Sequence, residues 1–144
     1  MFVPESCTDL CQPLDTYFHR QLKYIVKQFY FYESLHEPGE SSYLCTRNGV
    51  LKLHSLVHFV LSAPVFVPMI RYCWYSSGLW ADGGKPLFKN VSEVCFKPRA
   101  TDCSLMICDN DAFIKCSWCD LSFCFNDFYH KNHMLTCVKN PFEN

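Results

Sequence analysis

The sequence has 144 residues, of which 49% are hydrophobic and 19% are charged, and its formal net charge is -1. This composition excludes a disordered chain, and the length suits one domain of ordinary size, alone or with a small appendage. The near-zero net charge excludes a global basic field of the kind that draws proteins to nucleic acid or anionic lipid.

The chain contains 11 cysteines, which a secreted protein would use in disulfides and an intracellular protein as metal ligands or small buried hydrophobes. The first residues, Met1 to Cys7, contain neither a basic nor an apolar run, so we expect no signal peptide. An odd number of cysteines would also leave one thiol unpaired in a secreted protein. We therefore expect an intracellular protein that is not secreted, located in the nucleus or a virion, with cysteines that bind metal.

A long helix is predicted from Pro13 to His36, closed by the Pro38-Gly39 turn. A first, apolar stripe recurs along it at spacings of three and four and comprises Leu14, Phe18, Leu22, Ile25, Phe29 and Tyr32. A second stripe of aromatic residues (Tyr17, Tyr24 and Phe31) repeats every seven residues. The helix is therefore either buried on two sides within its own domain or docked on a second subunit, and the pattern leaves both open.

Three further elements are predicted before residue 100. A second helix covers Gly49 to Ser62, a strand or short helix covers Val65 to Tyr75, and Val91 to Phe96 has the composition of a strand. His54 and His58 share a face of the second helix, but no third ligand accompanies them, so we interpret them as ordinary surface or core histidines.

The most apolar stretch of the chain does not predict a membrane span. It runs from Leu56 to Ile70 and is about 15 residues long, short of the ~20 residues that a spanning helix needs. Pro64 and Pro68 interrupt it, so we interpret it as buried core with a break at the prolines.

The chemistry of the chain is concentrated in residues 101–144. Six cysteines and two histidines lie close together there, which is the number of ligands that two tetrahedral zinc sites require. The predicted ligands are Cys103, Cys108, Cys116, Cys119, Cys124, His130, His133 and Cys137.

The better-defined zinc site combines Cys116-x2-Cys119 with His133-x3-Cys137. A Cys-x2-Cys knuckle places two thiolates on one ion through a tight turn, and His-x3-Cys on a helix places both ligands on one face. The pattern resembles a zinc finger of the two-Cys, His, Cys type with one extra residue in its loop.

The second site would use Cys103, Cys108, Cys124 and His130. In chain order the eight ligands form four successive pairs. The first and third pairs would bind one ion, and the second and fourth pairs would bind the other. This interleaved order resembles the cross-brace of RING and MYND modules, most closely in residues 115–119. The first pair departs from those families by its x4 spacing, and His130 must stand in for a cysteine after Cys124. We expect two Zn²⁺ ions, with one ion plus two buried free cysteines as the alternative.

Several function classes are excluded or disfavoured by the same residues. The chain contains no phosphate loop, nucleophile elbow or zinc-protease motif, and four ligands per ion leave no open position for water, so we expect no enzyme. Residues 101–144 contain three basic and six acidic residues, so we do not expect nucleic acid as a partner. Residues 51–100 carry six basic and two acidic residues, which leaves weak contact there open.

We therefore expect an α+β fold with two regions, a mainly α-helical aromatic core or docking region over 1–100 and a small zinc-binding module, cross-brace or finger-like, over 101–144. The expected function is that of a structural, protein-interaction subunit whose partners are other proteins of a larger assembly, with no small-molecule substrate. The layout is also similar to a family of short baculovirus proteins described as RING- or U-box-like, which implies nucleocapsid assembly. The alternative is a RING-like ubiquitin ligase, for which Trp118, Leu121 and Phe123 would form the apolar groove.

Overall fold

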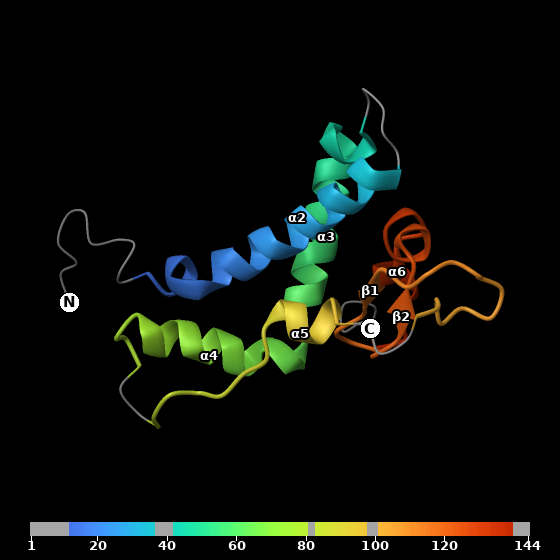
Figure 1. Ribbon diagram of the computed structural model, residues 1–144. Coiled ribbons are helices and arrows are strands. Elements are labelled where there is room, and N and C mark those ends of the chain that lie inside the picture. The colour runs from blue at the N-terminus through green and yellow to red at the C-terminus, as the bar shows by residue number, and fades with distance from the viewer. Residues whose placement is uncertain (1–11, 37–41, 81–82, 98–100, 140–144) are drawn as a thin grey trace.

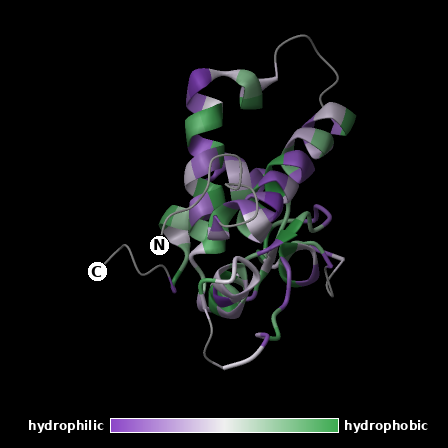
Figure 2. Cartoon of the chain, turned by 90° about the vertical axis from the view of Figure 1, so that its left-hand side faces the viewer, coloured by the Kyte–Doolittle hydropathy of each residue, from purple (hydrophilic) through white to green (hydrophobic). Residues whose placement is uncertain are grey.

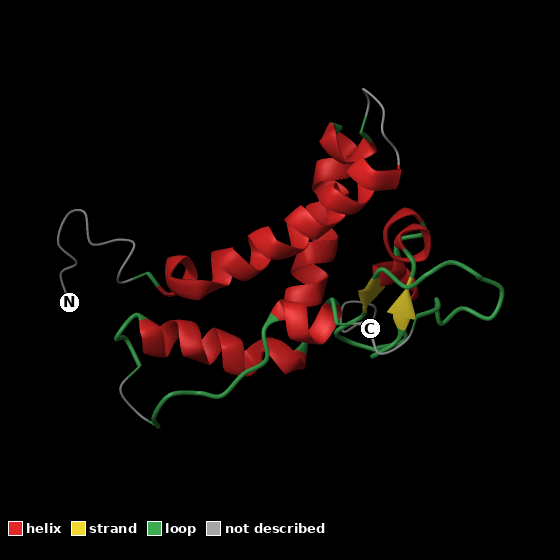
Figure 3. Cartoon of the chain, viewed as in Figure 1, coloured by secondary structure: helices red, strands yellow, loops and turns green. Residues whose placement is uncertain are grey.

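The computed structural model describes residues 12–36, 42–80, 83–97 and 101–139, and it confirms the predicted fold class, α+β and mainly helical. The helices precede a Cys/His module whose sheet has only two short strands (Figures 1 and 3). The helices and strands are a π-helical turn Leu14–Phe18, α2 His19–His36, α3 Arg47–Leu61, α4 Val67–Ser76, α5 Val91–Cys95, β1 Ile114–Lys115, β2 Ser122–Phe123, a second π-helical turn Asn126–His130 and α6 His133–Thr136, with 3-10 turns at Tyr43–Cys45 and Pro64–Phe66.

The predicted first helix is confirmed as one continuous helical segment, in which the π-helical turn leads into α2. Ile25 and Phe29 of the predicted apolar stripe are buried in the core, and Leu14 at its start is exposed. In Figure 2 hydrophobic and hydrophilic residues alternate along the long helices, as expected where one face is buried and the other solvated. The Pro38-Gly39 turn and the segment Met1 to Cys7 lie outside the described residues.

α3 begins two residues before its predicted start because Thr46 caps it, with its hydroxyl accepting a hydrogen bond from the Gly49 amide at 3.1 Å. The position of Gly49 requires a glycine. A Cβ there would lie 2.0 Å from the carbonyl oxygen of Tyr43, which is closer than any side-chain carbon can approach a backbone oxygen. This contact sets how closely the 3-10 turn Tyr43–Cys45 packs against α3.

The region after α3 is helical, whereas the sequence was compatible with strands there. The Val65 to Tyr75 segment forms a 3-10 turn and then α4, so the short-helix alternative is confirmed. The strand predicted at Val91 to Phe96 is wrong, because the segment forms α5. Asn90 and Glu93 form a reciprocal capping box at its start, which satisfies two backbone amides that a strand would have had to pair.

Within the described ranges, no single helix is long and apolar enough to cross a membrane. α3 and the segment Pro64–Ser76 reach the required length and composition only when taken together, and they are bent by 70° at the break between them.

The helices and the Cys/His module share one hydrophobic core. Phe29 of α2 is 1% exposed, and its ring lies 5.0 to 6.2 Å, centroid to centroid, from the four module rings Phe113, Phe125, Phe128 and Tyr129. Trp118 of the module stacks on Phe59 of α3 and donates to the Phe59 carbonyl at 2.7 Å. The predicted boundary at residue 100 falls outside the described residues.

The second aromatic stripe of the first helix is mostly used inside the chain. Tyr17 packs edge-on against Tyr72 and Phe88, and Tyr24 packs edge-on against Phe96. Phe31, the third member, is 62% exposed. The arrangement therefore favours a helix buried on two sides over a docking face of three aromatic residues.

Candidate metal centre

A two-stranded hairpin carries the central cysteine pair. β1 and β2 pair antiparallel, with Ile114 opposite Phe123, and the turn between them contains Cys116-x2-Cys119. The Asp120 amide donates to the Cys116 carbonyl at 3.0 Å and the Cys116 amide to the Leu121 carbonyl at 2.8 Å. Asp120 has a φ of 67°, the left-handed conformation that a tight turn needs and that aspartate tolerates better than most residues. The turn therefore points both thiols to one side.

Four ligand-type side chains meet at this turn and form what we call group 1, Cys116, Cys119, His133 and Cys137. Their ligand atoms all lie within 4.8 Å of one another. His133 Nε2 lies 3.5 Å from Cys119 Sγ. The structure therefore brings together the two pairs that the sequence assigned to one site.

His133 is held in place by its backbone and by two aromatic rings. Asn132, directly before α6, has a φ of 56°, and this left-handed residue turns the chain so that His133 begins the helix facing inward. The His133 ring lies 3.9 Å from the Phe123 ring and 5.6 Å from the Phe128 ring, centroid to centroid. Packing of this kind fixes the ring orientation before any ion binds.

A second cluster, which we call group 2, contains Cys103, Cys108, Cys124 and Asp127, with ligand atoms that again lie within 4.8 Å of one another. Cys108 Sγ lies 3.7 Å from Cys124 Sγ. Asp127 Oδ2 lies 3.1 Å from Cys124 Sγ and 3.3 Å from Cys103 Sγ. Three of the four predicted ligands of the second site therefore meet.

The fourth position of group 2 is taken by Asp127, where the sequence assigned His130. Asp127 follows Cys124 at the same x2 spacing as in Cys116-x2-Cys119, and this spacing is the signal that could have found it. His130 is exposed, and its ring packs beside Tyr43 and Phe125 instead. The π-helical turn Asn126–His130 separates the two side chains by three residues, which turns them to different sides.

The electrostatics of both groups depend on burial and on the neighbouring ligands. In group 1 a hydrogen bond from the Cys116 thiol, followed by one from His133, lowers the pKa of Cys119 to about 4, while the same bond raises the pKa of Cys116. In group 2 burial raises the pKa of Cys124 to about 12. The Lys131 ammonium, 2.5 Å from Asp127 Oδ1, holds the pKa of Asp127 well below its usual range.

Amide N–H groups donate to several of the sulfur atoms. The Asp127 amide donates to Cys124 Sγ at 3.4 Å, and the Asn110 side-chain amide donates to Cys108 Sγ at the same distance. In group 1 the Leu121 amide lowers the pKa of Cys119 by the same kind of bond. Amide donors stabilise the thiolate, which is the form of cysteine that binds a metal.

The donor set and spacing fit a tetrahedral zinc ion. An ion bound at ~2.3 Å by sulfur and ~2.0 Å by nitrogen holds two sulfur atoms ~3.8 Å apart and a sulfur and a nitrogen ~3.5 Å apart. The Cys108–Cys124 and Cys119–His133 distances are 3.7 and 3.5 Å. The distances from sulfur to Asp127 are a few tenths of an ångström shorter than an ion between them would set. Both groups could thus hold a metal ion, and four ligands each would leave no open coordination position.

Other candidate residues lie elsewhere. His54 and His58 are exposed on α3 and belong to no ligand group among the described residues. Of the three residues required for a ligase groove, Trp118 is bound to the Phe59 carbonyl and Phe123 is 3% exposed, whereas only Leu121 presents a largely free side chain.

Residues 74–137 match the profile of the Tc5 transposase C-terminal domain. The match covers less than half of the chain, and it contains all eight residues of groups 1 and 2. No curated protein and no solved structure matches the chain. The matched family is neither a MYND nor a RING module, and the resemblances to those modules and to small baculovirus proteins are not shown.

This match corrects one prediction. The sequence predicted that nucleic acid is an unlikely partner because residues 101–144 are acidic, but a transposase is a DNA-acting protein, and the matched residues 74–137 include most of that acidic region. The physical reason for the error is that net charge averages over the surface. Binding to a polyanion depends on where the cations lie, and a neutral chain can still carry a basic face.

Proposed function

We propose that the chain is a zinc-stabilised, non-catalytic module that holds together a DNA-associated protein complex. The observation that carries this proposal is the presence of two closed four-ligand groups inside the segment that matches a transposase domain. A closed coordination sphere supports a structural role for each ion, because a catalytic zinc keeps one position for water or substrate.

The alternating order of the ligands supports a scaffold role. Group 1 takes the second and fourth ligand pairs along the chain and group 2 takes the first and third. Neither ion could then leave without loosening segments that the other one holds. This is the property that cross-brace modules of the RING and MYND kind use to present a rigid surface, and we propose the same use here without their ligase or peptide-binding chemistry.

Zinc is the proposed metal in both groups. Three thiolates with one imidazole, and three thiolates with one carboxylate, are soft to borderline donor sets in tetrahedral array, which favours zinc over magnesium or calcium. An intracellular location is proposed because thiolate ligands need a reducing environment, and a nuclear one because the proposed complex is associated with DNA.

The test uses the full chain, purified with zinc, and a fluorescently labelled 20-base-pair duplex. We expect binding at 50 mM salt, measured by fluorescence anisotropy, and loss of that binding after a chelator removes the metal. The duplex should stay uncut on a gel, because the proposed role is not catalytic. Absence of duplex binding by the zinc-loaded chain, or cleavage of the duplex, would contradict the proposal.

A further inference from the structure

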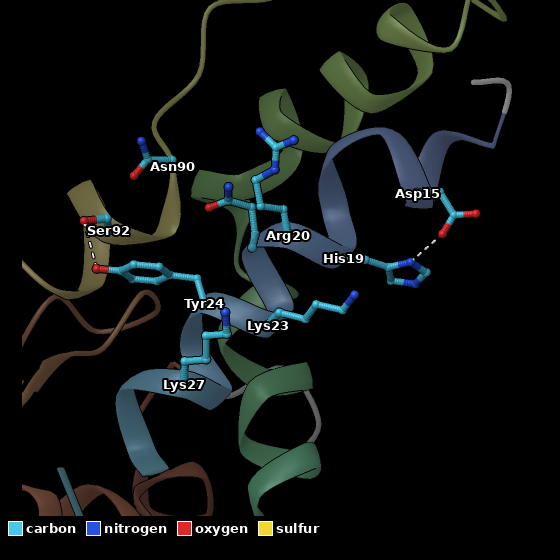
Figure 4. A pocket seen from close by; sticks show the side chains of 9 residues that line it. Asp15, His19, Arg20, Lys23, Tyr24, Lys27, Asn90 and Ser92 are labelled. Carbon is cyan, nitrogen blue, oxygen red and sulfur yellow. Dashed lines mark hydrogen bonds and ion pairs between the residues drawn. The ribbon is translucent and has the colours of Figure 1, made fainter. Parts of the chain in front are cut away.

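A groove of about 630 Å³ lies between α2 and the start of α5, outside the metal module. Figure 4 shows Tyr24 reaching across from α2, where its hydroxyl bonds to Ser92 Oγ at 3.2 Å, and three cationic side chains projecting from the same helix. These are Arg20, Lys23 and Lys27, which we call the α2 cations.

The α2 cations are exposed and have no carboxylate partner among the described residues. Two carboxylates at the groove, Asp15 in its lining and Glu93 on the adjoining α5, are already engaged. Asp15 bonds to His19 Nδ1 at 2.7 Å, and Glu93 accepts the Asn90 amide at 2.8 Å in the capping box. Three uncompensated positive charges on one helix face repel each other, and an external anion would relieve that repulsion.

The spacing of these cations matches a nucleic-acid backbone. Residues 20, 23 and 27 recur at intervals of three and four, so they lie on one face of α2 and span about 10 Å along its axis. One strand of duplex DNA carries a phosphate every ~3.4 Å along the helix axis, so the same length covers about three phosphates.

The opposite charge of the metal module determines where DNA can approach. Residues 101–144 have twice as many acidic as basic residues, and the module packs against the C-terminal half of α2 through Phe29 and Tyr32. The α2 cations lie in the N-terminal half of α2. A duplex is therefore attracted to one half of the helix and repelled from the other.

We propose that the α2 cations contact the phosphate backbone of duplex DNA, while the metal module contributes no phosphate contact. This inference rests on the proposed function, and it names a surface before residue 74, where the family match begins. Contacts of this kind position a protein on DNA without reading its sequence.

The experiment compares two triple variants of the full zinc-loaded chain with equal loss of charge. The first is Arg20→Gln, Lys23→Gln and Lys27→Gln. The control is Arg47→Gln, Arg71→Gln and Lys139→Gln, three exposed cations that do not line the groove. Binding to a random 20-base-pair duplex is measured by fluorescence anisotropy between 50 and 300 mM salt. Binding to anionic lipid vesicles is measured separately under the same conditions. Circular dichroism checks that both variants fold.

For the α2 variant we expect at least a tenfold loss of affinity at 100 mM salt. The slope of log affinity against log salt should fall in magnitude by about 2 to 3, since each lost phosphate contact removes about one. The control variant should keep the wild-type slope. Equal losses in both variants, or an α2 variant that binds like wild type, would overturn this inference and leave the proposed function standing. A wild-type chain that binds vesicles but no duplex would overturn both.

Discussion

The Asp127 carboxylate is the most constrained side chain of group 2. It is 3% exposed, one of its oxygen atoms faces two sulfur atoms, and the other faces the Lys131 ammonium. Positive charge beside a buried carboxylate compensates for its lost hydration, and here each oxygen atom has a side from which a cation can do so. Lys131 supplies one side, and a divalent cation among the sulfur atoms would supply the other.

Exchange of Asp127 therefore tests the composition of group 2. Asp127→Asn keeps the size of the side chain and replaces an anionic ligand by a neutral amide, so we expect release of one of two ions. His130→Gln, three residues away and exposed, should keep both. Native mass spectrometry counts the ions in each variant. Loss of an ion in the His130 variant, with both retained in the Asp127 variant, would return the ligand role to His130.

Cys119→Ser tests group 1 in the same way. The serine hydroxyl is a poor zinc ligand, and structural zinc in small modules contributes ~10–16 kcal/mol of apparent binding free energy, so we expect the module to unfold. Cys45→Ser is the matched control, because Cys45 is a free, exposed cysteine outside both groups. A Cys119 variant that keeps its ions and its thermal transition would show that group 1 is misassigned.

Cysteine spacing predicted most of the candidate site, and it could not predict Asp127. The Cys-x2-Cys and His-x3-Cys pairs are short-range patterns whose geometry follows from one turn or one helical turn. A carboxylate is a common surface residue, so Asp127 stands out only once the fold buries it beside three thiols. His130, in contrast, has the right chemistry for a ligand and the wrong position on its π-helical turn.

At the scale of elements, periodicity over many residues was a better guide than composition over few. The stripe along Pro13 to His36 repeats over several turns and predicted a helix that the structure contains. The five-residue α5 has β-branched residues that favour a strand, but the Asn90 and Glu93 capping box decides its conformation. The box is visible in the sequence and could have been used.

Phe29 connects α2 to the metal module, and a neighbour on the same helix provides its control. Phe29→Ala removes a ring that contacts four module rings, so we expect a loss of about 3–5 kcal/mol in the free energy of unfolding. Phe31→Ala changes a ring that is 62% exposed and should cost less than about 0.5 kcal/mol. Urea unfolding of the zinc-loaded variants measures both values. Similar losses in the two variants would contradict the shared core.

Gly49 controls how the 3-10 turn Tyr43–Cys45 packs on α3. Gly49→Ala places a carbon against the Tyr43 carbonyl oxygen, and the backbone must shift to relieve the clash, so we expect a destabilisation of about 1–3 kcal/mol. The Gly49 carbonyl also accepts a hydrogen bond from the Tyr129 hydroxyl at 3.0 Å, and the backbone shift should weaken this bond to the module. Ser55→Ala, exposed on the same helix, is the control. A Gly49 variant whose thermal midpoint equals that of the Ser55 variant would refute the clash.

For the whole molecule, the shared core means that metal and helices should stabilise each other. A domain of this size has a total stability of about 5–15 kcal/mol, and a structural zinc ion supplies a comparable amount. Ions bound at groups 1 and 2 would therefore decide the stability of the entire chain and not of the module alone. This coupling follows from contacts such as Trp118 with Phe59, which pair distant residues and which no local sequence pattern reveals.

Removal of the metal should accordingly unfold the helices as well. After chelation we expect the circular dichroism signal at 222 nm to fall by more than the short helix α6 can explain, because α2 and α3 lose the aromatic face on which they pack. Addition of zinc should restore the signal. A helical signal that survives chelation unchanged would show that the two regions fold independently.

The most direct test of the account counts the metal ions in the unmodified chain. Native mass spectrometry of the full-length protein, purified under reducing conditions, should show the mass of the polypeptide plus two zinc ions, less the protons that zinc binding displaces from the cysteine thiols. Two ions follow from two closed ligand groups with alternating pairs. A spectrum with one ion or none at saturating zinc would contradict the account.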